Sequence, residues 1–196
     1  MGDNFITNCK NLKSITFRNN EINGFPTCYG CPKFKELKLD GNEDKYKIEN
    51  NILYTADGKK LIFCPYGKAE DIIIPNYVET IGNYSFFAAN VKTITIPDSV
   101  IKIGNGAFQS SAIESIIIGK NVKQIGGNAF LNCRKLKKVT INSDIVAGAT
   151  NNSCYLLENR ETIYIYSYIT EIGSYITDNY GVTTNDKEGY VKYIKK

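Results

Sequence analysis

The chain has 196 residues, of which 42% are hydrophobic, and its 24 basic and 20 acidic side chains give a net charge of +4. This composition is that of an ordinary folded protein, and no run approaches the roughly 18 to 20 apolar residues of a membrane span. Basic and acidic residues are interspersed along the sequence, which argues against the one-sided basic stripe of a nucleic-acid-binding protein. The chain has no histidine, so a Ser-His or Cys-His catalytic pair is excluded.

The N-terminal residues repeat a pattern that recurs later in the chain. Residues 1–17 align without gaps on the segment that begins at Ile125, and Cys9 takes the place of Cys133. The chain thus opens partway through a repeat, and we expect it to be a fragment of a longer protein. The first residues lack the basic start and apolar run of a secretory signal peptide, so no such signal is predicted in this chain.

Residues 40–71 interrupt the repeat. Two alternating runs, 52–55 and 60–64, flank the dipeptide Asp57-Gly58. Asp-Gly between such runs is the strongest short-range signal for a β-hairpin. The sequence therefore predicts that one coil carries a β-hairpin insertion.

Residues 72–141 hold the most regular part, a period of 22 residues. Three copies start at Ile72, Ile94 and Ile116, and the third gains one residue before the next strand at Val139. The same spacing separates their Ile-Gly pairs and their aromatic residues Phe86, Phe108 and Phe130. A fixed period at several positions indicates a solenoid in which each copy is one coil stacked on its neighbours.

Each coil is expected to contain two short strands. Alternating β-branched residues, as in 113–118, predict a half-buried strand, and stacking joins these strands into a parallel sheet. A second strand ends at an Ile-Gly pair, whose glycine suits a turn with positive φ. The small residue and aromatic that follow, such as Ala107-Phe108, predict a short helical turn on the convex side.

The C-terminal part, residues 142–196, is expected to contain a degenerate coil and a cap. The repeat pattern resumes at 163–165, and the final residues are polar enough to close the end of a solenoid. We therefore predict one domain, residues 1–196, built as a right-handed, mostly β solenoid with short helical turns.

Six cysteines and two Asn-x-Ser/Thr sequons are candidates for disulfide, metal or glycosylation sites. Cys9, Cys31 and Cys133 share one repeat position, which favours small buried thiols, although a Cys9–Cys31 disulfide stays open. The pair Cys28-x-x-Cys31 is a weak zinc or redox signal without a second pair. The sequons at Asn83 and Asn151 leave glycosylation open. No catalytic, cofactor-binding or metal-binding residues are predicted.

These motifs resemble the BspA-like branch of leucine-rich repeat proteins. The resemblance rests on IPDSVIKIGNGAF at 96–108, on the Asn-Cys that follows the aromatic residue, and on NNILYTADGKKLIFCP at 50–65. It implies a leucine-rich-repeat solenoid and a surface or secreted protein of a host-associated bacterium or mucosal protozoan. It further implies a non-enzymatic adhesin that binds proteins or glycans of host or neighbouring cells. The chain has Tyr77, Ser99 and Asn121 where the wider family has an asparagine ladder.

A partner is expected on the outward face of the sheet. Exposed apolar residues among polar ones mark contact surfaces, and Ile73 and Ile117 interrupt an otherwise polar column. The predicted partner-binding face has one residue per coil: Thr16, Lys38, Ile73, Thr95, Ile117, Thr140 and Tyr164. A rival patch is formed by the tyrosines between Tyr164 and Tyr180. An alternative function is an intracellular leucine-rich-repeat scaffold for protein–protein interaction.

Overall fold

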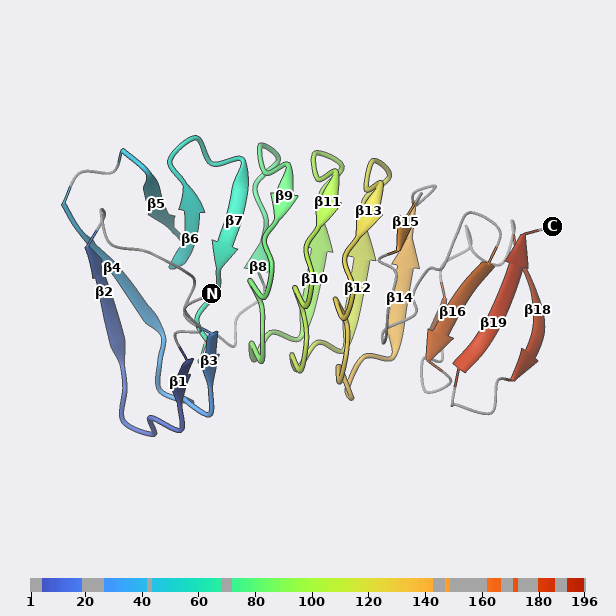
Figure 1. The fold of residues 1–196 in the computed structure, drawn as a ribbon, viewed down its shortest axis with the longest axis horizontal. Helices are drawn as coiled ribbons and strands as arrows, with labels where there is room; N and C mark the ends of the chain where they lie inside the picture. Colours follow the sequence, from blue (N-terminus) through green and yellow to red (C-terminus); the bar gives the residue numbers. More distant parts are fainter. Residues whose placement is uncertain are drawn as a thin grey trace.

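A computed structural model of the chain describes residues 5–18, 27–41, 44–67, 72–142, 147–148, 162–166, 171–172, 180–185 and 190–195. The described residues form β-strands joined by turns, and no helix occurs among them. The coils follow one another along the long axis of the molecule, from the N-terminal to the C-terminal strands (Figure 1). The molecule is a β-solenoid of the leucine-rich-repeat kind.

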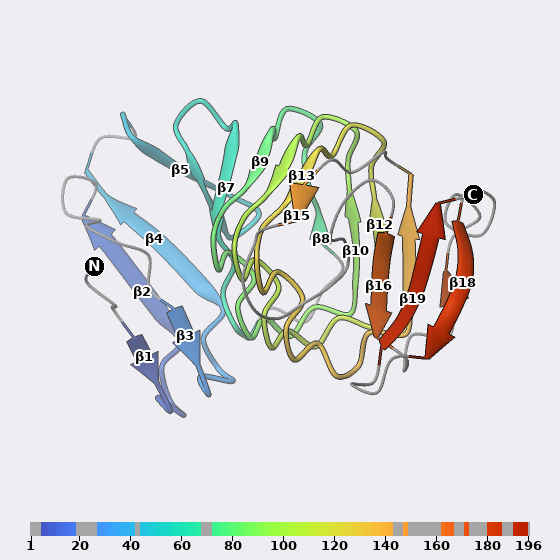
Figure 2. The ribbon, with the colours of Figure 1, turned by 45° about the vertical axis from the view of Figure 1, so that its right-hand side comes forward.

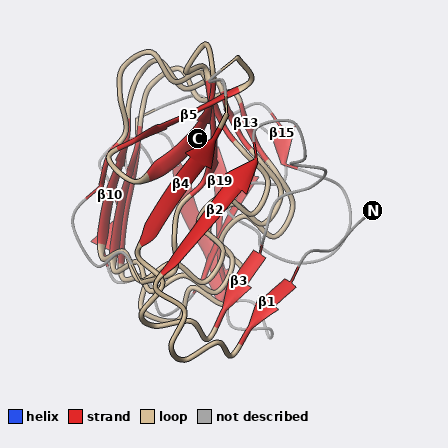
Figure 3. Ribbon diagram, turned by 90° about the vertical axis from the view of Figure 1, so that its left-hand side faces the viewer, coloured by secondary structure: helices blue, strands red, loops and turns tan. Residues whose placement is uncertain are grey.

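Two sheets form opposite walls of the regular coils, with β10 on one side and β13 on the other (Figure 3). The first wall is parallel throughout, and the second is parallel except at β5–β6 and β6–β7. The first wall contains β8 (Ile72–Ile73), β10 (Thr93–Ile96), β12 (Ser115–Ile118), β14 (Lys138–Ile141) and β17 (Glu171–Ile172). The second contains β5 (Tyr46–Glu49), β6 (Ile52–Thr55), β7 (Lys60–Phe63), β9 (Thr80–Ile81), β11 (Lys102–Ile103), β13 (Gln124–Ile125) and β15 (Ala147–Gly148).

Three smaller sheets lie toward the two ends of the chain. At the N-terminal end, β1 (Phe5–Thr7) pairs with β3 (Thr27–Tyr29), and β2 (Ser14–Arg18) pairs with β4 (Glu36–Asp40), both in parallel. At the C-terminal end, β16 (Thr162–Tyr166), β19 (Tyr190–Lys195) and β18 (Tyr180–Asn185) form an antiparallel sheet (Figure 2).

The period of 22 residues is confirmed by the strand register. Ile94 pairs with Ile116 in one wall, and Ile103 pairs with Ile125 in the other. Equivalent side chains therefore lie above one another in successive coils. The rings of Phe86, Phe108 and Phe130 stack in the core, with centroids 5.0 and 5.2 Å apart and planes within 11° and 6° of parallel. All three rings are fully buried, as the repeat predicted.

The predicted helical turns are wrong. Around Phe86 alternate amides bond to the next coil instead of to the same turn: Tyr84 N–H donates to Asn105 O, and Phe86 N–H donates to Ala107 O. Because these amides are used between coils, they cannot form i→i−4 helical bonds. The backbone also leaves the helical region on either side of Phe86, with φ of 54° at both Tyr84 and Ala88.

The glycines after the second strands are required for a reason other than the predicted positive φ. Gly82, Gly104 and Gly126 do not have the positive φ expected of them. A Cβ atom at Gly104 would lie 2.6 Å from the backbone nitrogen of Asn83 and 2.8 Å from the carbonyl carbon of Gly82. Glycine is required at this position because adjacent coils approach too closely for a side chain.

The predicted hairpin is not an insertion outside the solenoid. Strands β6 and β7 do pair antiparallel, but β7 also pairs in parallel with β9 and so belongs to the seven-stranded wall. One face of this pair carries Tyr54 and Leu61 into the core of the regular coils, and the other carries Leu53 and Ile62 into the N-terminal core. Both faces are buried, which explains why these strands read as nearly continuous apolar runs. The pair forms a partition between two cores.

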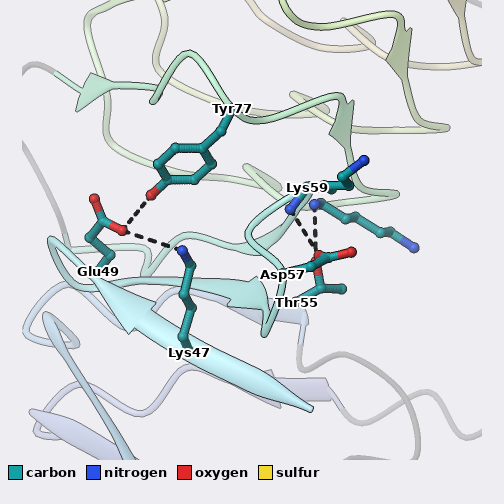
Figure 4. Close-up of polar contacts among 7 residues, drawn as sticks. Lys47, Glu49, Thr55, Asp57, Lys59 and Tyr77 are labelled. Atoms are coloured by element: carbon teal, nitrogen blue, oxygen red, sulfur yellow. Dashed lines mark hydrogen bonds and ion pairs between the residues drawn. The ribbon is translucent and has the colours of Figure 1, made fainter. Parts of the chain in front are cut away.

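Polar contacts join β5, the strand that pairs with β6, to the first regular coil (Figure 4). The Tyr77 hydroxyl donates to the Glu49 carboxylate, and Lys47 Nζ lies 3.7 Å from Glu49 Oε2 and 4.5 Å from the centroid of the Tyr77 ring. Burial and the neighbouring carboxylate raise the pKa of Tyr77 to about 12. The phenol thus remains a hydrogen-bond donor throughout the physiological range of pH.

Residues in place of the asparagine ladder still bond between coils. Ser99 Oγ donates to Val78 O at 2.8 Å, and Asn121 Nδ2 donates to Asp98 O at 2.8 Å. A short ladder that the sequence analysis missed lies elsewhere in the coil. Asn83 Oδ1 accepts the N–H of Asn105 at 2.9 Å, and Asn105 Oδ1 accepts the N–H of Gly127 at 3.0 Å. The 22-residue spacing of these two asparagines was the available signal.

The C-terminal strands differ from the predicted coil order. The strand that continues the first wall after β14 is β17, because Val139 pairs with Ile172. The segment expected to resume the wall at 163–165 lies in β16, which pairs antiparallel with β19. Of the predicted degenerate segment 146–161, Ala147–Gly148 forms β15 in the second wall, and the other residues lie outside the described ranges. The division of the chain at 40–71, 72–141 and 142–196 stays a prediction.

Candidate functional site

The outward face of the first wall is built by strict alternation along each strand. In β10 the side chains of Ile94 and Ile96 point into the core, while Thr93 and Thr95 are exposed. This period of two follows from the pleat of a β-strand. Since the strands pair in register, each exposed position forms a straight column across the coils.

The main column consists of Ile73, Thr95, Ile117 and Thr140 from β8, β10, β12 and β14. Ile73 is 84% exposed and Ile117 is 36% exposed, although isoleucine is usually a core residue. A second column of Thr93, Ser115 and Lys138 lies beside the first. We call the surface formed by these two columns the sheet face.

Two predicted residues lie on another sheet, since Thr16 and Lys38 form a neighbouring pair in the two-stranded sheet β2–β4. Lys38 there forms an ion pair with Glu36 at 3.3 Å. The predicted column is therefore not continuous, because Thr16 and Lys38 form a separate pair at the N-terminal end.

Tyr164 does not belong to the column. It lies in β16, where it pairs with Lys192 in the antiparallel C-terminal sheet. The tyrosine side chains of the rival patch lie outside the described side chains. The part of the predicted site that the structure brings together is therefore Ile73, Thr95, Ile117 and Thr140.

An ion pair fixes the loops where β10 and β12 end. Asp98 Oδ1 accepts the backbone N–H of Lys120 at 2.9 Å, and Asp98 Oδ2 lies 3.2 Å from Lys120 Nζ. These interactions lower the pKa of Asp98, the backbone hydrogen bond being the largest cause. The contact joins adjacent coils, so it holds the strands of the sheet face in register.

The cysteines that share a repeat position differ in exposure. Cys31 and Cys133 are fully buried, whereas Cys9 is exposed, and none of these three forms a disulfide in the structure. Cys133 Sγ donates to Phe108 O at 2.9 Å, which identifies it as part of the turn between coils.

The Cys28-x-x-Cys31 pair lies in the N-terminal core. Burial, with a further contribution from Cys31, raises the pKa of the Cys28 thiol to about 12. A thiol in this state is a poor nucleophile, because the thiolate is the reactive form. Within the described ranges, no group of three or more Cys, Asp or Glu residues has an arrangement that could hold a metal ion.

The sequon at Asn83 has an exposed asparagine but a fully buried Ser85 hydroxyl. The sequon at Asn151 lies outside the described residues. Among the described residues, no helix is long and apolar enough to cross a membrane.

Comparison with one solved structure supports the fold, and a second aligns more weakly. A leucine-rich cell surface protein of Faecalibacterium prausnitzii A2-165 aligns with a TM-score of 0.51 and 21% identity over 87% of this chain. The pneumococcal vaccine antigen PcpA aligns with a TM-score of 0.43 and 16% identity over 89% of it. This chain spans 51% and 55% of the length of those two structures. Among curated proteins, none matches the sequence.

The sequence itself identifies the family. Six copies of the repeat described as the BspA type leucine rich repeat region match residues 59–183, which is more than half of the chain. This range includes the three stacked coils with Phe86, Phe108 and Phe130. The chain belongs to the BspA-type leucine-rich repeat family.

Proposed function

We propose that this chain is a non-enzymatic recognition module of a cell-surface adhesin, and that the sheet face binds a protein on a host or neighbouring cell. The observation that carries the proposal is the 84% exposure of Ile73, in register with Thr95 and Ile117. Exposed apolar side chains rimmed by polar ones favour protein contact.

The backbone under this face supports binding by a rigid surface. Ile72, Ile94, Ile116 and Val139 are buried directly behind the exposed column, and each strand is hydrogen-bonded to its neighbours. A surface that is already ordered loses little conformational entropy when a partner binds. Threonine and isoleucine are also β-branched, so they have few rotamers to lose.

The cell-surface location is supported by resemblance. One structure with this fold is named a leucine-rich cell surface protein. An adhesin must present a stable binding surface outside the cell, and a solenoid provides one that lengthens with each coil. Adhesion is the use of the sheet face that agrees best with both observations.

The test compares Ile73→Glu with a matched variant, Ile101→Glu. Ile101 is also an exposed isoleucine, at 46%, but it precedes β11 in the opposite wall. Both proteins would be titrated against a panel of extracellular-matrix proteins and against cultured epithelial cells. We expect Ile73→Glu to weaken binding roughly tenfold or more, as at an interface hot spot, and Ile101→Glu to leave it within about twofold.

Thermal melts of both variants check that the fold is retained. The double variant Ile73→Glu/Ile117→Glu extends the test across the column. Equal binding by wild type and this double variant to every partner that wild type binds would reject the sheet face.

A further inference from the structure

The turns that lead into the first strand of each coil carry an unusual concentration of positive charge. Their described residues include one or more exposed cations in most coils. We call this set the basic edge, and its members are Lys10, Lys13, Lys33, Lys35, Lys92, Arg134, Lys135 and Lys137. The one acidic residue in the described part of these turns is Glu114.

Backbone hydrogen bonds show that these turns are stacked in one continuous line. At the N-terminal end Lys35 N–H donates to Lys13 O, and at the other end Lys137 N–H donates to Glu114 O. The intervening steps run from Phe34 to Gly67, from Tyr66 to Asn90, and from Lys92 to Glu114. Five steps at a strand separation of about 4.8 Å give a line about 24 Å long. The links into β10, β12 and β14 lie along the lower side of the molecule in Figure 1.

Several acidic side chains elsewhere form ion pairs with other cations. The five ion pairs found among the described residues are Arg18–Asp40, Lys38–Glu36, Lys47–Glu49, Lys59–Glu79 and Lys120–Asp98. None of them includes a member of the basic edge. Within the described part of the chain, the modest net charge therefore conceals an uneven distribution of charge, with eight exposed cations and one acidic residue in the turns of this edge.

The densest part of the edge is held on a rigid turn. Cys133 and Leu136 are fully buried, and Leu136 N–H donates to Cys133 O at 3.0 Å. Arg134 and Lys135 lie between these two buried residues and Lys137 follows them, and all three side chains are exposed to solvent. This coil is also the one that is a residue longer than its neighbours, and the longer turn accommodates both Arg134 and Lys135. Clusters of lysine and arginine of this length are typical of polyanion-binding patches.

We infer that the basic edge is a binding site for a linear sulfated polysaccharide, separate from the sheet face. A line of cations spread over several coils, with its densest group at Arg134, Lys135 and Lys137, suits a linear polymer that carries many negative charges. Seven of the eight cations are lysines, which act as point charges toward sulfate groups. The described turns present no exposed aromatic ring for base stacking, which disfavours single-stranded nucleic acid. They also present no large exposed apolar side chain for insertion into a membrane.

The experiment measures heparin binding to the whole chain at several salt concentrations. The test variant is Arg134→Gln/Lys135→Gln/Lys137→Gln, and the control is Lys45→Gln/Lys102→Gln/Lys123→Gln, which removes the same charge from exposed positions off the edge. We expect the test variant to bind heparin roughly tenfold more weakly and the control to remain within about twofold of wild type. The dependence of affinity on salt should also be shallower for the test variant, since fewer ions are released on binding.

Three comparison ligands make the outcome decisive. Desulfated heparin should bind much more weakly than heparin, and so should an oligothymidylate and vesicles that contain phosphatidylserine. An equal loss in the control variant would show non-specific attraction and overturn the site, as would absence of heparin binding at physiological salt. Tighter binding of the oligothymidylate or the vesicles would overturn the choice of a sulfated glycan.

A second variant protects the test against misfolding. Lys10→Gln/Lys13→Gln/Lys33→Gln/Lys35→Gln removes charge at the other end of the same line, and a similar loss of heparin binding is expected. Unchanged heparin affinity in this variant would contradict a continuous edge. None of these substitutions touches Ile73 or Ile117, so failure here would leave the proposal for the sheet face standing.

Discussion

At the scale of single residues, one buried hydroxyl does not fit its repeat position. Ser85 is fully buried, and its Oγ atom has no hydrogen-bond partner in the structure. The equivalent residues in the next two coils are Ala107 and Ala129, which need no partner. A buried polar group without a hydrogen bond lowers stability, because it has lost its bonds to water.

Replacing Ser85 with alanine should therefore stabilise the protein. We expect Ser85→Ala to raise the free energy of unfolding by about 1 kcal/mol, measured by urea denaturation. Ser111→Ala is the matched control, because Ser111 is also buried but its Oγ lies 3.5 Å from Cys133 Sγ in a hydrogen bond. That variant should lose stability. Destabilisation of similar size in both variants would show that Ser85 has a partner after all.

Residue spacing predicted the buried positions better than the turn geometry. The period placed Phe86, Phe108 and Phe130 in one stack, because a repeat fixes which side chains are equivalent. It did not reveal why Gly104 is glycine. Positive φ and close approach of two chains both require glycine, and only the distance to the neighbouring coil separates the two causes.

At the scale of elements, aspartates hold turns in place. Asp57 Oδ1 accepts hydrogen bonds from Thr55 Oγ1 at 2.6 Å and from the N–H of Lys59 at 2.9 Å in the turn between β6 and β7 (Figure 4). These bonds lower the pKa of Asp57, the one from Thr55 being the largest cause. Asp98 has a lowered pKa from its bonds to Lys120.

Stability should consequently fall in acid. A carboxyl group whose pKa is lower in the folded protein stabilises the fold fully above its unfolded pKa of 3.8, and this contribution is lost as the pH falls through the folded pKa. We expect Asp57→Asn/Asp98→Asn to have a lower melting temperature than wild type at pH 7. Its melting temperature should also fall by less than that of wild type between pH 5 and pH 2. The control is Asp44→Asn, which replaces an exposed aspartate, and its melting temperature should change with pH as that of wild type does. Parallel curves for wild type and the double variant would contradict the role of these two carboxylates.

The hairpin shows where sequence reasoning about elements stops. The Asp57-Gly58 signal located the turn between β6 and β7 correctly, since turn chemistry is local. Its packing was missed, because burial on both faces depends on what the chain before and after the strands brings alongside them. The run 60–64 was interpreted as alternating, but residues 61–63 are apolar without a break, and this was the available sign of a strand with two buried faces.

At the scale of the whole molecule, the distribution of charge over the surface could not be predicted from the order of charged residues along the chain. Lys13, Lys35, Lys92 and Lys137 are far apart in sequence, yet stacking places them on one edge. Several acidic residues that separate them in sequence form ion pairs away from the edge, such as Lys59–Glu79, and Glu114 is the one acidic residue in the described part of the edge. Interspersed charges exclude a basic stripe only in a chain without repeats, because a repeat can align one position of every coil.

The two cores predict how the solenoid unfolds. Leu53 belongs to the N-terminal core and Phe108 to the core of the regular coils, and the β6–β7 pair separates them. In a solenoid each unit is stabilised mainly by contacts with its neighbours. A substitution that leaves a cavity in one core should therefore weaken the nearby coils most. Both side chains are fully buried, and replacement by alanine should cost about 2–5 kcal/mol for Leu53 and about 3–5 kcal/mol for Phe108.

Hydrogen exchange resolved by residue tests this separation. Leu53→Ala should reduce protection mainly in β3 and β4, while Ile103 and Ile125 in the regular coils keep most of theirs. Phe108→Ala should give the reverse pattern. Partial independence follows because the buried side chains on the two sides of the partition form two separate clusters. A uniform loss of protection along the whole chain in both variants would show that the cores unfold as one unit, with the β6–β7 pair coupling them instead of dividing them.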